Sequence, residues 1–147
     1  MTEVAVIVGG GPGVSASCAR LFNKEGMKVA VAARNIGKTA LKKLADDHGV
    51  QLIACDAADP DSVASLFDTV KQDLGNPTVV VHNIDGRSAD IFRKRITEVD
   101  PALVQSVIAN STYSAFLVGQ QAARCLMEND IGDNGRGSII FTNASAA

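Results

Sequence analysis

The sequence predicts an α/β fold in which helices cover both faces of a doubly wound parallel sheet. Short apolar runs rich in β-branched residues alternate with longer amphipathic stretches along the 147 residues. The apolar runs are nearly continuous, which is typical of strands that are buried on both faces of a parallel sheet. Right-handed crossovers between the five strand-like runs give the order 3-2-1-4-5, with ligands at the carboxyl ends of the strands.

The individual segments are supported by the residues at their boundaries. Asp59 and Asp100 each precede a proline, so each aspartate supplies an N-cap acceptor and the proline takes the first helical position. Gly26, Gly49 and Gly75 each follow a helical pattern, where glycine commonly ends a helix. We expect one domain over residues 1–147, with strands at 4–8, 28–33, 51–54, 78–81 and 138–141 and helices at 14–25, 38–48, 60–74 and 101–128.

Composition and charge argue against several classes of protein. A formal net charge of −2 and a charged content of 20% give no bulk attraction to nucleic acid or to an anionic membrane. No apolar run approaches the ~18 residues of a membrane span, and the first residues lead directly into a strand. The three cysteines lie far apart and lack metal-ligand spacing, so we expect no metal site and a reduced, cytoplasmic protein.

A glycine-rich turn, VGGGPGVSAS, connects the first strand to the first helix. Such a turn can bring backbone N–H groups and the positive end of a helix against a phosphate. Its glycines, followed by a serine, resemble the TGxxxGxG turn of the short-chain dehydrogenase/reductase family, with serine in place of the third glycine. The alternative is a glycine-rich turn that binds nothing. On the resemblance, the residues expected to bind a dinucleotide here are Gly9, Gly11, Gly13, Val14 and Ser15.

The resemblance extends along the whole chain and implies a Rossmann-like, NADP-binding domain. Neutral Ala33 followed by Arg34 resembles the NADP-preferring members of the family. A guanidinium can pair with a 2′-phosphate through charge-assisted hydrogen bonds, whereas an acid at position 33 would repel that phosphate. Asp56 stands where the family holds the adenine amino group, and Ala57 beside it is also expected to contact the cofactor. The alternatives are a surface arginine and a solvated aspartate.

A further segment, VVVHNIDGR, resembles the NNAG segment of the family. Asn83 matches its second asparagine and is therefore a cofactor-binding candidate. Ile84 and Asp85 stand where alanine and glycine are expected, unless Gly86 takes the glycine role after a shift. Because a carboxylate beside cofactor phosphates is unfavourable, this departure is expected to weaken cofactor binding.

The resemblance implies hydride transfer between a nicotinamide and a carbonyl or alcohol carbon, with a tyrosine that exchanges the proton. In the family a lysine lowers the pKa of that tyrosine within a YxxxK pair. Here Tyr113 is the only tyrosine and Lys94 is the last lysine, so the pair is absent from these residues. Asn110 in IANSTYSAF matches the asparagine that helps to hold a relay water. The substrate-orienting serine falls at Ala144, and Ser145 could serve only if the strand end shifts by one residue.

Two functions fit these observations. The first is an NADP(H)-dependent oxidoreductase that acts on a small carbonyl or alcohol substrate and forms a homodimer or homotetramer when complete. On this hypothesis the chain is the cofactor-binding portion, lacks the C-terminal part of the family fold, and is inactive alone. The second is a non-catalytic nucleotide sensor or interaction protein with the same fold, which the missing YxxxK pair favours.

Overall fold

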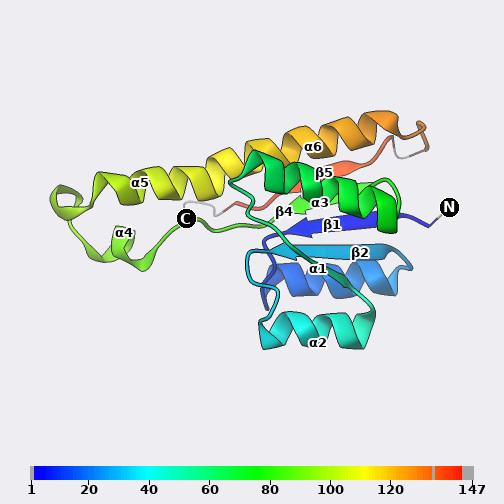
Figure 1. The fold of residues 1–147 in the computed structure, drawn as a ribbon, viewed down its shortest axis with the longest axis horizontal. Helices are drawn as coiled ribbons and strands as arrows, with labels where there is room; N and C mark the ends of the chain where they lie inside the picture. The colour runs from blue at the N-terminus through cyan, green and yellow to red at the C-terminus, as the bar shows by residue number, and fades with distance from the viewer. Residues whose placement is uncertain (1, 134, 144–147) are drawn as a thin grey trace.

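The fold is built around a parallel sheet, as the sequence predicts. The computed structural model describes residues 2–133 and 135–143 (Figure 1). Within them, the strand order β3-β2-β1-β4-β5 confirms the predicted order, and all four neighbouring pairs are parallel. The strands are β1 (Val4–Val8), β2 (Lys28–Ala33), β3 (Gln51–Ala54), β4 (Val79–His82) and β5 (Ser138–Phe141).

Helices pack on both faces of the sheet (Figure 1). Two helices, α1 (Val14–Lys24) and α2 (Thr39–His48), lie on one face, and α3 (Pro60–Asp73) and α6 (Ser114–Glu128) lie on the other. Helix α5 (Pro101–Ile108) extends the line of α6 past the carboxyl ends of the strands. No helix in the described ranges is both long enough and apolar enough to cross a lipid bilayer. The helices of the described chain are α1 (Val14–Lys24), α2 (Thr39–His48), α3 (Pro60–Asp73), α4 (Ala89–Arg93), α5 (Pro101–Ile108) and α6 (Ser114–Glu128), with a single 3-10 turn, η1 (Ile96–Glu98).

The central strand β1 explains why the apolar runs are continuous. Val4, Val6 and Val8 pack in the hydrophobic cluster that includes side chains of α3 and α6. Ala5 and Ile7 point the other way, into the cluster that includes side chains of α1 and α2. Every residue of β1 is at most 1% exposed. A polar side chain at any position of β1 would therefore be buried in one of the two clusters, whichever face of the sheet it pointed to.

The predicted helix boundaries are confirmed by their contacts. The side chain of Asp59 accepts a hydrogen bond from the backbone N–H of Asp61, and that of Asp100 accepts one from Ala102. Beyond three helix ends, glycines adopt the left-handed conformation, with φ of 85° at Gly26, 62° at Gly49 and 118° at Gly75. Other helix and strand ends differ from the predicted ones by one residue, which is the usual variation of such boundaries.

The long helix predicted over residues 101–128 is interrupted. A π-helical segment, η2 (Ala109–Tyr113), separates α5 from α6, although the run continues without a sharp break (Figure 1). Two serine hydroxyls bond to carbonyls of the preceding turn, Ser111 to Val107 and Ser114 to Asn110. Side-chain bonds of this kind compete with the regular helical pattern. The sequence also did not predict α4 or η1, which together contain no buried residue.

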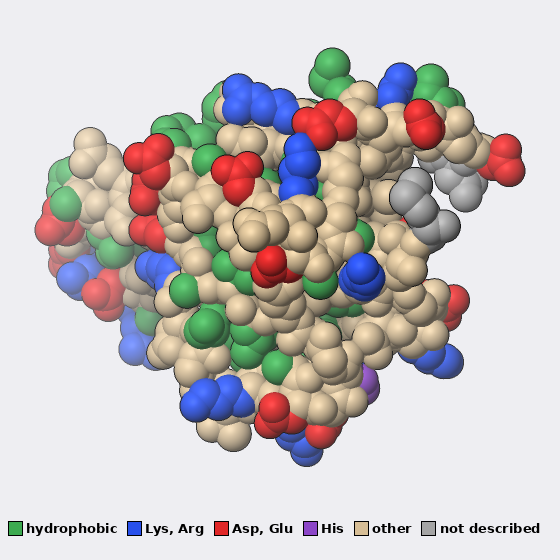
Figure 2. Space-filling view, turned by 45° about the vertical axis from the view of Figure 1, so that its right-hand side comes forward, with side chains coloured by type: hydrophobic (Ala, Val, Ile, Leu, Met, Phe, Trp, Pro, Cys, Tyr) green, Lys and Arg blue, Asp and Glu red, His purple; other side chains and the backbone are tan. Residues whose placement is uncertain are grey.

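The visible surface carries charges of both signs. Figure 2 shows Lys and Arg side chains interspersed with Asp and Glu, without a large area of one sign on that face. This distribution agrees with the small net charge of −2.

Candidate functional site

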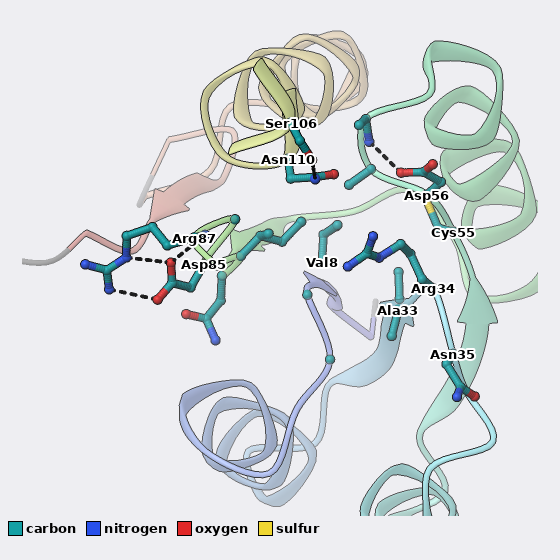
Figure 3. A pocket seen from close by; sticks show the side chains of 18 of the residues that line it. Val8, Ala33, Arg34, Asn35, Cys55, Asp56, Asp85, Arg87, Ser106 and Asn110 are labelled. Atoms are coloured by element: carbon teal, nitrogen blue, oxygen red, sulfur yellow. Dashed lines mark hydrogen bonds and ion pairs between the residues drawn. The ribbon is translucent and has the colours of Figure 1, made fainter. Parts of the chain in front are cut away.

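A cavity of about 630 Å³ lies at the carboxyl ends of the strands (Figure 3). Its walls come from the glycine-rich turn, the ends of β2 and β3, the loop after β4, and helix α5. The carboxyl edge of the sheet is where ligands bind in doubly wound folds. The structure brings the following candidate residues together in its lining: Gly9, Arg34, Asp56, Ala57, Asn83 and Asn110.

Other candidate residues lie outside that lining. Gly11, Gly13, Val14 and Ser15 form the rest of the turn and the first residues of α1, beside the cavity wall made by Gly9. Ser145, like Ala144, lies outside the described residues.

Gly9 allows the turn to approach the end of β4 closely. Its φ is +105°, and a Cβ built there would lie 2.1 Å from the carbonyl oxygen of Asn83. Gly10 is similarly restricted, because a Cβ there would lie 2.9 Å from Cγ1 of Val31. Gly10 was not among the residues predicted for the turn, although it lies within the run of three glycines at positions 9–11. Both positions require glycine for packing, whether or not a ligand is bound.

A hydrogen-bond chain fixes the turn to the ends of β4 and β5. The Ser15 hydroxyl donates to the carbonyl of Gly9 at 2.7 Å and accepts from Nδ2 of Asn83 at 2.7 Å. The hydroxyl of Thr142 donates to Oδ1 of Asn83 at 2.7 Å. Since Ser15 is only 1% exposed, its side chain holds the turn from behind rather than facing the cavity.

The open side of the turn has the properties of an anion site. A Cβ at Gly11 or Gly13 would meet no described atom within 4 Å, so the backbone is accessible there. Gly13 is the N-cap of α1, and in the described structure no side chain caps this helix. The first amides of α1 are therefore available to a negatively charged group.

The segment that connects β2 to α2 carries two cationic side chains. Arg34 and Lys38 both line the cavity, are exposed, and form no ion pair with any residue that the structure describes. The sequence did not lead us to Lys38, although its place four residues after Arg34 at the start of α2 was a signal. At the end of the neighbouring strand β3, Oδ1 of Asp56 accepts a hydrogen bond from the N–H of Ala58 at 3.0 Å.

The Asp85 carboxylate is paired with Arg87, a contact that the sequence did not predict. Arg87 binds it through Nε at 2.7 Å and Nη2 at 2.8 Å, and its backbone N–H donates at 3.1 Å. These hydrogen bonds lower the pKa of Asp85 to about 2. The guanidinium also lies 5.0 Å from the ring centre of Phe92. The carboxylate that is expected to weaken cofactor binding therefore has a cationic partner two residues away.

Gly86 packs against the π-helical segment η2. A Cβ there would lie 2.9 Å from the backbone nitrogen of Ser111 and 3.0 Å from backbone atoms of Asn110 and Val107. A glycine at this position therefore lets the loop after β4 approach the helix that carries Asn110. The side-chain amide of Asn110 donates to the hydroxyl of Ser106 at 3.2 Å.

His82 is a buried polar residue that is connected to Asn110 through Ser114. The sequence motifs did not identify it as a candidate residue of the cofactor site. It is 3% exposed, and its Nε2 lies 2.8 Å from the Ser114 hydroxyl. That hydroxyl donates to the backbone carbonyl of Asn110 at 2.8 Å, so Nε2 of His82 is the donor to Ser114. Burial lowers the pKa of His82, which favours the neutral ring. Within the described ranges, no three His, Cys, Asp or Glu side chains are grouped so that they could hold a metal ion.

The parallel sheet, its crossover order and the glycine-rich turn define a Rossmann-like α/β protein. A family model described as enoyl-(acyl carrier protein) reductase matches residues 10–147. The chain belongs to the short-chain dehydrogenase/reductase family.

Relatives and solved structures agree with this assignment. (+)-Borneol dehydrogenase 1 of Salvia officinalis is 28% identical over 145 residues, covering 95% of this chain and 51% of that protein. An NADP-dependent (R)-specific alcohol dehydrogenase of Lentilactobacillus kefiri is 32% identical over 83 residues, covering 55% of this chain and 33% of that protein. A short-chain type dehydrogenase/reductase from Mycobacterium marinum is 27% identical with a TM-score of 0.82, covering 95% of this chain and 54% of that one. The chain spans about half the length of the curated relatives it matches.

Proposed function

We propose that this chain is the cofactor-binding portion of an NADP(H)-dependent oxidoreductase that acts on a small carbonyl or alcohol substrate. The observation that carries the proposal is a cavity wall with two cations, Arg34 and Lys38, that form no ion pair within the described chain and lie beside neutral Ala33. Two cations without a carboxylate at position 33 suit a 2′-phosphate better than a ribose diol. The name of the Lentilactobacillus kefiri relative, which is NADP-dependent, supports this preference.

The residues present fit a dinucleotide. The open backbone at Gly11 and Gly13, with the uncapped start of α1, would receive phosphate groups. Arg34 and Lys38 would hold the 2′-phosphate, and Asp56 would accept from the adenine amino group. When bound, the cofactor would donate a hydride to a carbonyl carbon or accept one from an alcohol carbon. Asn83 and Ser15 would act indirectly, because their side chains fix the turn that contacts the phosphates.

The catalytic proton transfer is proposed for the whole protein. Asn110 lines the cavity and stays a candidate for the relay, whereas the YxxxK pair that the family uses does not occur in these residues. We therefore expect the 147-residue chain to bind cofactor at best weakly and not to turn over carbonyl or alcohol substrates. Binding without turnover is also what the alternative, a nucleotide sensor, requires. A longer protein that contains a YxxxK pair and oxidises NADPH with a ketone or aldehyde would favour the enzyme.

Two further properties remain part of the proposal. Cys18, Cys55 and Cys125 are all free thiols, which supports a reducing, cytoplasmic setting. We also propose a homodimer or homotetramer for the complete protein.

Cofactor selectivity is the direct test. Calorimetric titration of the chain with NADPH and NADH should show a preference for NADPH. Arg34→Ala should reduce that preference about 10- to 150-fold, the range for loss of a charge-assisted hydrogen bond. Arg93→Ala is the matched control, because Arg93 is exposed on α4 and does not line the cavity. Equal affinities for the two cofactors in the wild-type chain, or an Arg34→Ala variant with unchanged selectivity, would remove the assignment.

A further inference from the structure

The Asp85–Arg87 pair occupies a distinct position in the cavity. Figure 3 shows Asp85 and Arg87 on one side of Val8 and Arg34 on the other. The loop that carries the pair starts next to the glycine-rich turn, since a Cβ at Gly9 would lie 2.7 Å from Cγ1 of Ile84. Both members of the pair line the cavity. The cavity therefore has arginines on two sides, one paired with a carboxylate and one without an ion-pair partner in the described chain.

The guanidinium of Arg87 keeps donors for a second acceptor. An arginine has five N–H donors, and Asp85 takes one from Nε and one from Nη2. The Nη1 group and the other Nη2 hydrogen have no acceptor among the described residues. The ring of Phe92 at 5.0 Å supports the guanidinium by a cation–π contact. Arg87 is thus held in one orientation with part of its hydrogen-bonding capacity unused.

The pair is accessible to solvent and carries no net charge. The Arg87 side chain is 46% exposed and that of Asp85 is 61% exposed. Exposed ion pairs contribute little free energy, so an incoming anion does not face a strong competing interaction. The negative charge of Asp85 nevertheless cancels most of the attraction that Arg87 would exert on such an anion.

We propose that Arg87 is a second anion-binding residue of this cavity, which takes a phosphate group of the dinucleotide, and that Asp85 limits its affinity. The proposal rests on the dinucleotide binding proposed above. Asp85 has two opposing effects: it orients the guanidinium through two hydrogen bonds and it repels the phosphate. The pair thereby sets how tightly the cavity holds a phosphate-bearing ligand.

The pair makes predictions of opposite sign. Arg87→Gln leaves the carboxylate of Asp85 uncompensated in the cavity and should weaken NADPH binding about 3- to 10-fold, a range reduced for solvent exposure. Asp85→Asn keeps an acceptor for Arg87 but removes the repulsion, and should strengthen binding by about the same factor. The double variant lacks both charges and should bind more nearly like the wild-type chain than either single variant does.

The experiment measures dissociation constants by calorimetry for two probes, NADPH and inorganic pyrophosphate, at low and high salt. The shifts of both single variants should shrink at high salt, because they arise from charge. Lys71→Gln and Glu128→Gln are matched controls, since these residues form the other ion pair of the described chain, away from the cavity. Thermal melting verifies that each variant is folded. Should Arg87→Gln not fold, Arg87→Lys, which keeps the charge but loses the two-point geometry, should bind more weakly than wild type.

The outcomes separate this inference from the proposed function. Unchanged constants in the Asp85 and Arg87 variants, with NADPH binding that still depends on Arg34, would overturn the anion site and leave the proposed function standing. A wild-type chain that binds pyrophosphate but not NADPH, with constants that follow the predicted order, would support Arg87 as an anion-binding residue but reject both the dinucleotide as its ligand and the proposed function. Weaker binding by Asp85→Asn would also overturn the inference, because Asp85 would then be assisting the ligand.

Discussion

Ser15 stands at the third glycine position of the family's turn, and its contacts explain why a serine fits there. The hydroxyl bonds to the carbonyl of Gly9 and to the amide of Asn83, so it joins the two ends of the turn. A glycine at this position would only permit the close approach of the chain segments. The serine instead holds the turn in place through its two hydrogen bonds.

Because the Ser15 side chain is buried, we expect its removal to destabilise the fold. Ser15→Ala leaves the Gly9 carbonyl and the Asn83 amide without their partner at a site that is 1% exposed. The free energy of unfolding should fall by about 1–3 kcal/mol, measured by urea denaturation. Ser17→Ala on the same helix is the control, because Ser17 is exposed and, among the described residues, its side chain bonds to that of exposed Arg20 alone. An equal loss in both variants would contradict the structural role given to Ser15.

We expect His82 to make the stability of the chain depend on pH. Burial lowers its pKa in the folded state below the ~6.5 of an unfolded histidine. Between these two values the unfolded chain binds more protons, so the free energy of unfolding falls as the pH falls through about 6.5. Asp85, with a pKa of about 2, contributes only below about pH 4, outside this window.

Equilibrium unfolding between about pH 7.5 and 5.5 measures this effect. The wild-type chain should lose stability over the range, and His82→Gln should show a flatter profile. His48→Gln is the control, because it removes the histidine of α2 and leaves the contact of His82 with Ser114 intact. A wild-type profile that stays flat, or a slope that survives in His82→Gln, would exclude His82 as the source.

The candidate residues found from the sequence lie in local motifs, whereas the contacts that the sequence did not predict depend on tertiary packing or on loop conformation. Arg34, Asp56 and Asn83 each lie beside a strand end and within a motif, and the structure places all three in the cavity lining. The contact of His82 with Ser114 joins residues 32 positions apart and depends on how α6 packs on β4. The pairing of Asp85 with Arg87 depends on loop conformation, which no periodicity encodes.

At the level of helices and strands, local signals predicted the boundaries well. Aspartate followed by proline, and glycine beyond a helix end, act through their own backbone geometry and need no tertiary context. The π-helical segment η2 was not predicted, because residues such as Asn110, Ser111 and Thr112 weaken a regular helix without specifying which irregular turn replaces it. Its irregular turn depends on serine hydroxyls bonded to carbonyls and on the close approach of Gly86.

A prediction on Gly86 tests this packing of the loop on the helix. In Gly86→Ala the methyl group would lie within 3.0 Å of backbone atoms of Ser111, Asn110 and Val107, which cannot rotate away. We expect a loss of about 1–3 kcal/mol in unfolding free energy and shifted amide resonances over residues 107–111. Gly11→Ala is the matched control, since a methyl group at that position would have no described atom within 4 Å. Unshifted resonances in Gly86→Ala would show that the loop does not press on η2.

For the whole molecule, burial is graded across the sheet. The central strand β1 pairs on both sides and is at most 1% exposed. The strand β5 pairs with β4 alone among the described strands, and its residues Ile140 and Phe141 are 45% and 49% exposed. The predicted order 3-2-1-4-5 already placed β1 inside the sheet and β5 at its edge, and the structure confirms this. The apolar pattern alone could not do so, because a run such as SIIF looks the same wherever the strand lies in the sheet.

This gradient predicts the order in which the backbone opens. Amide hydrogen exchange of the 147-residue chain should be slowest in β1, where exchange requires global unfolding, because its amides lie between two paired strands and two hydrophobic clusters. Exchange should be faster in β5, and fastest in α4 and η1, which have no buried residue. Residue-resolved exchange over a range of low denaturant concentrations measures the opening free energy of each strand. Equal opening free energies for β5 and β1 would mean that the sheet unfolds as one unit. The graded exposure would then have no thermodynamic consequence.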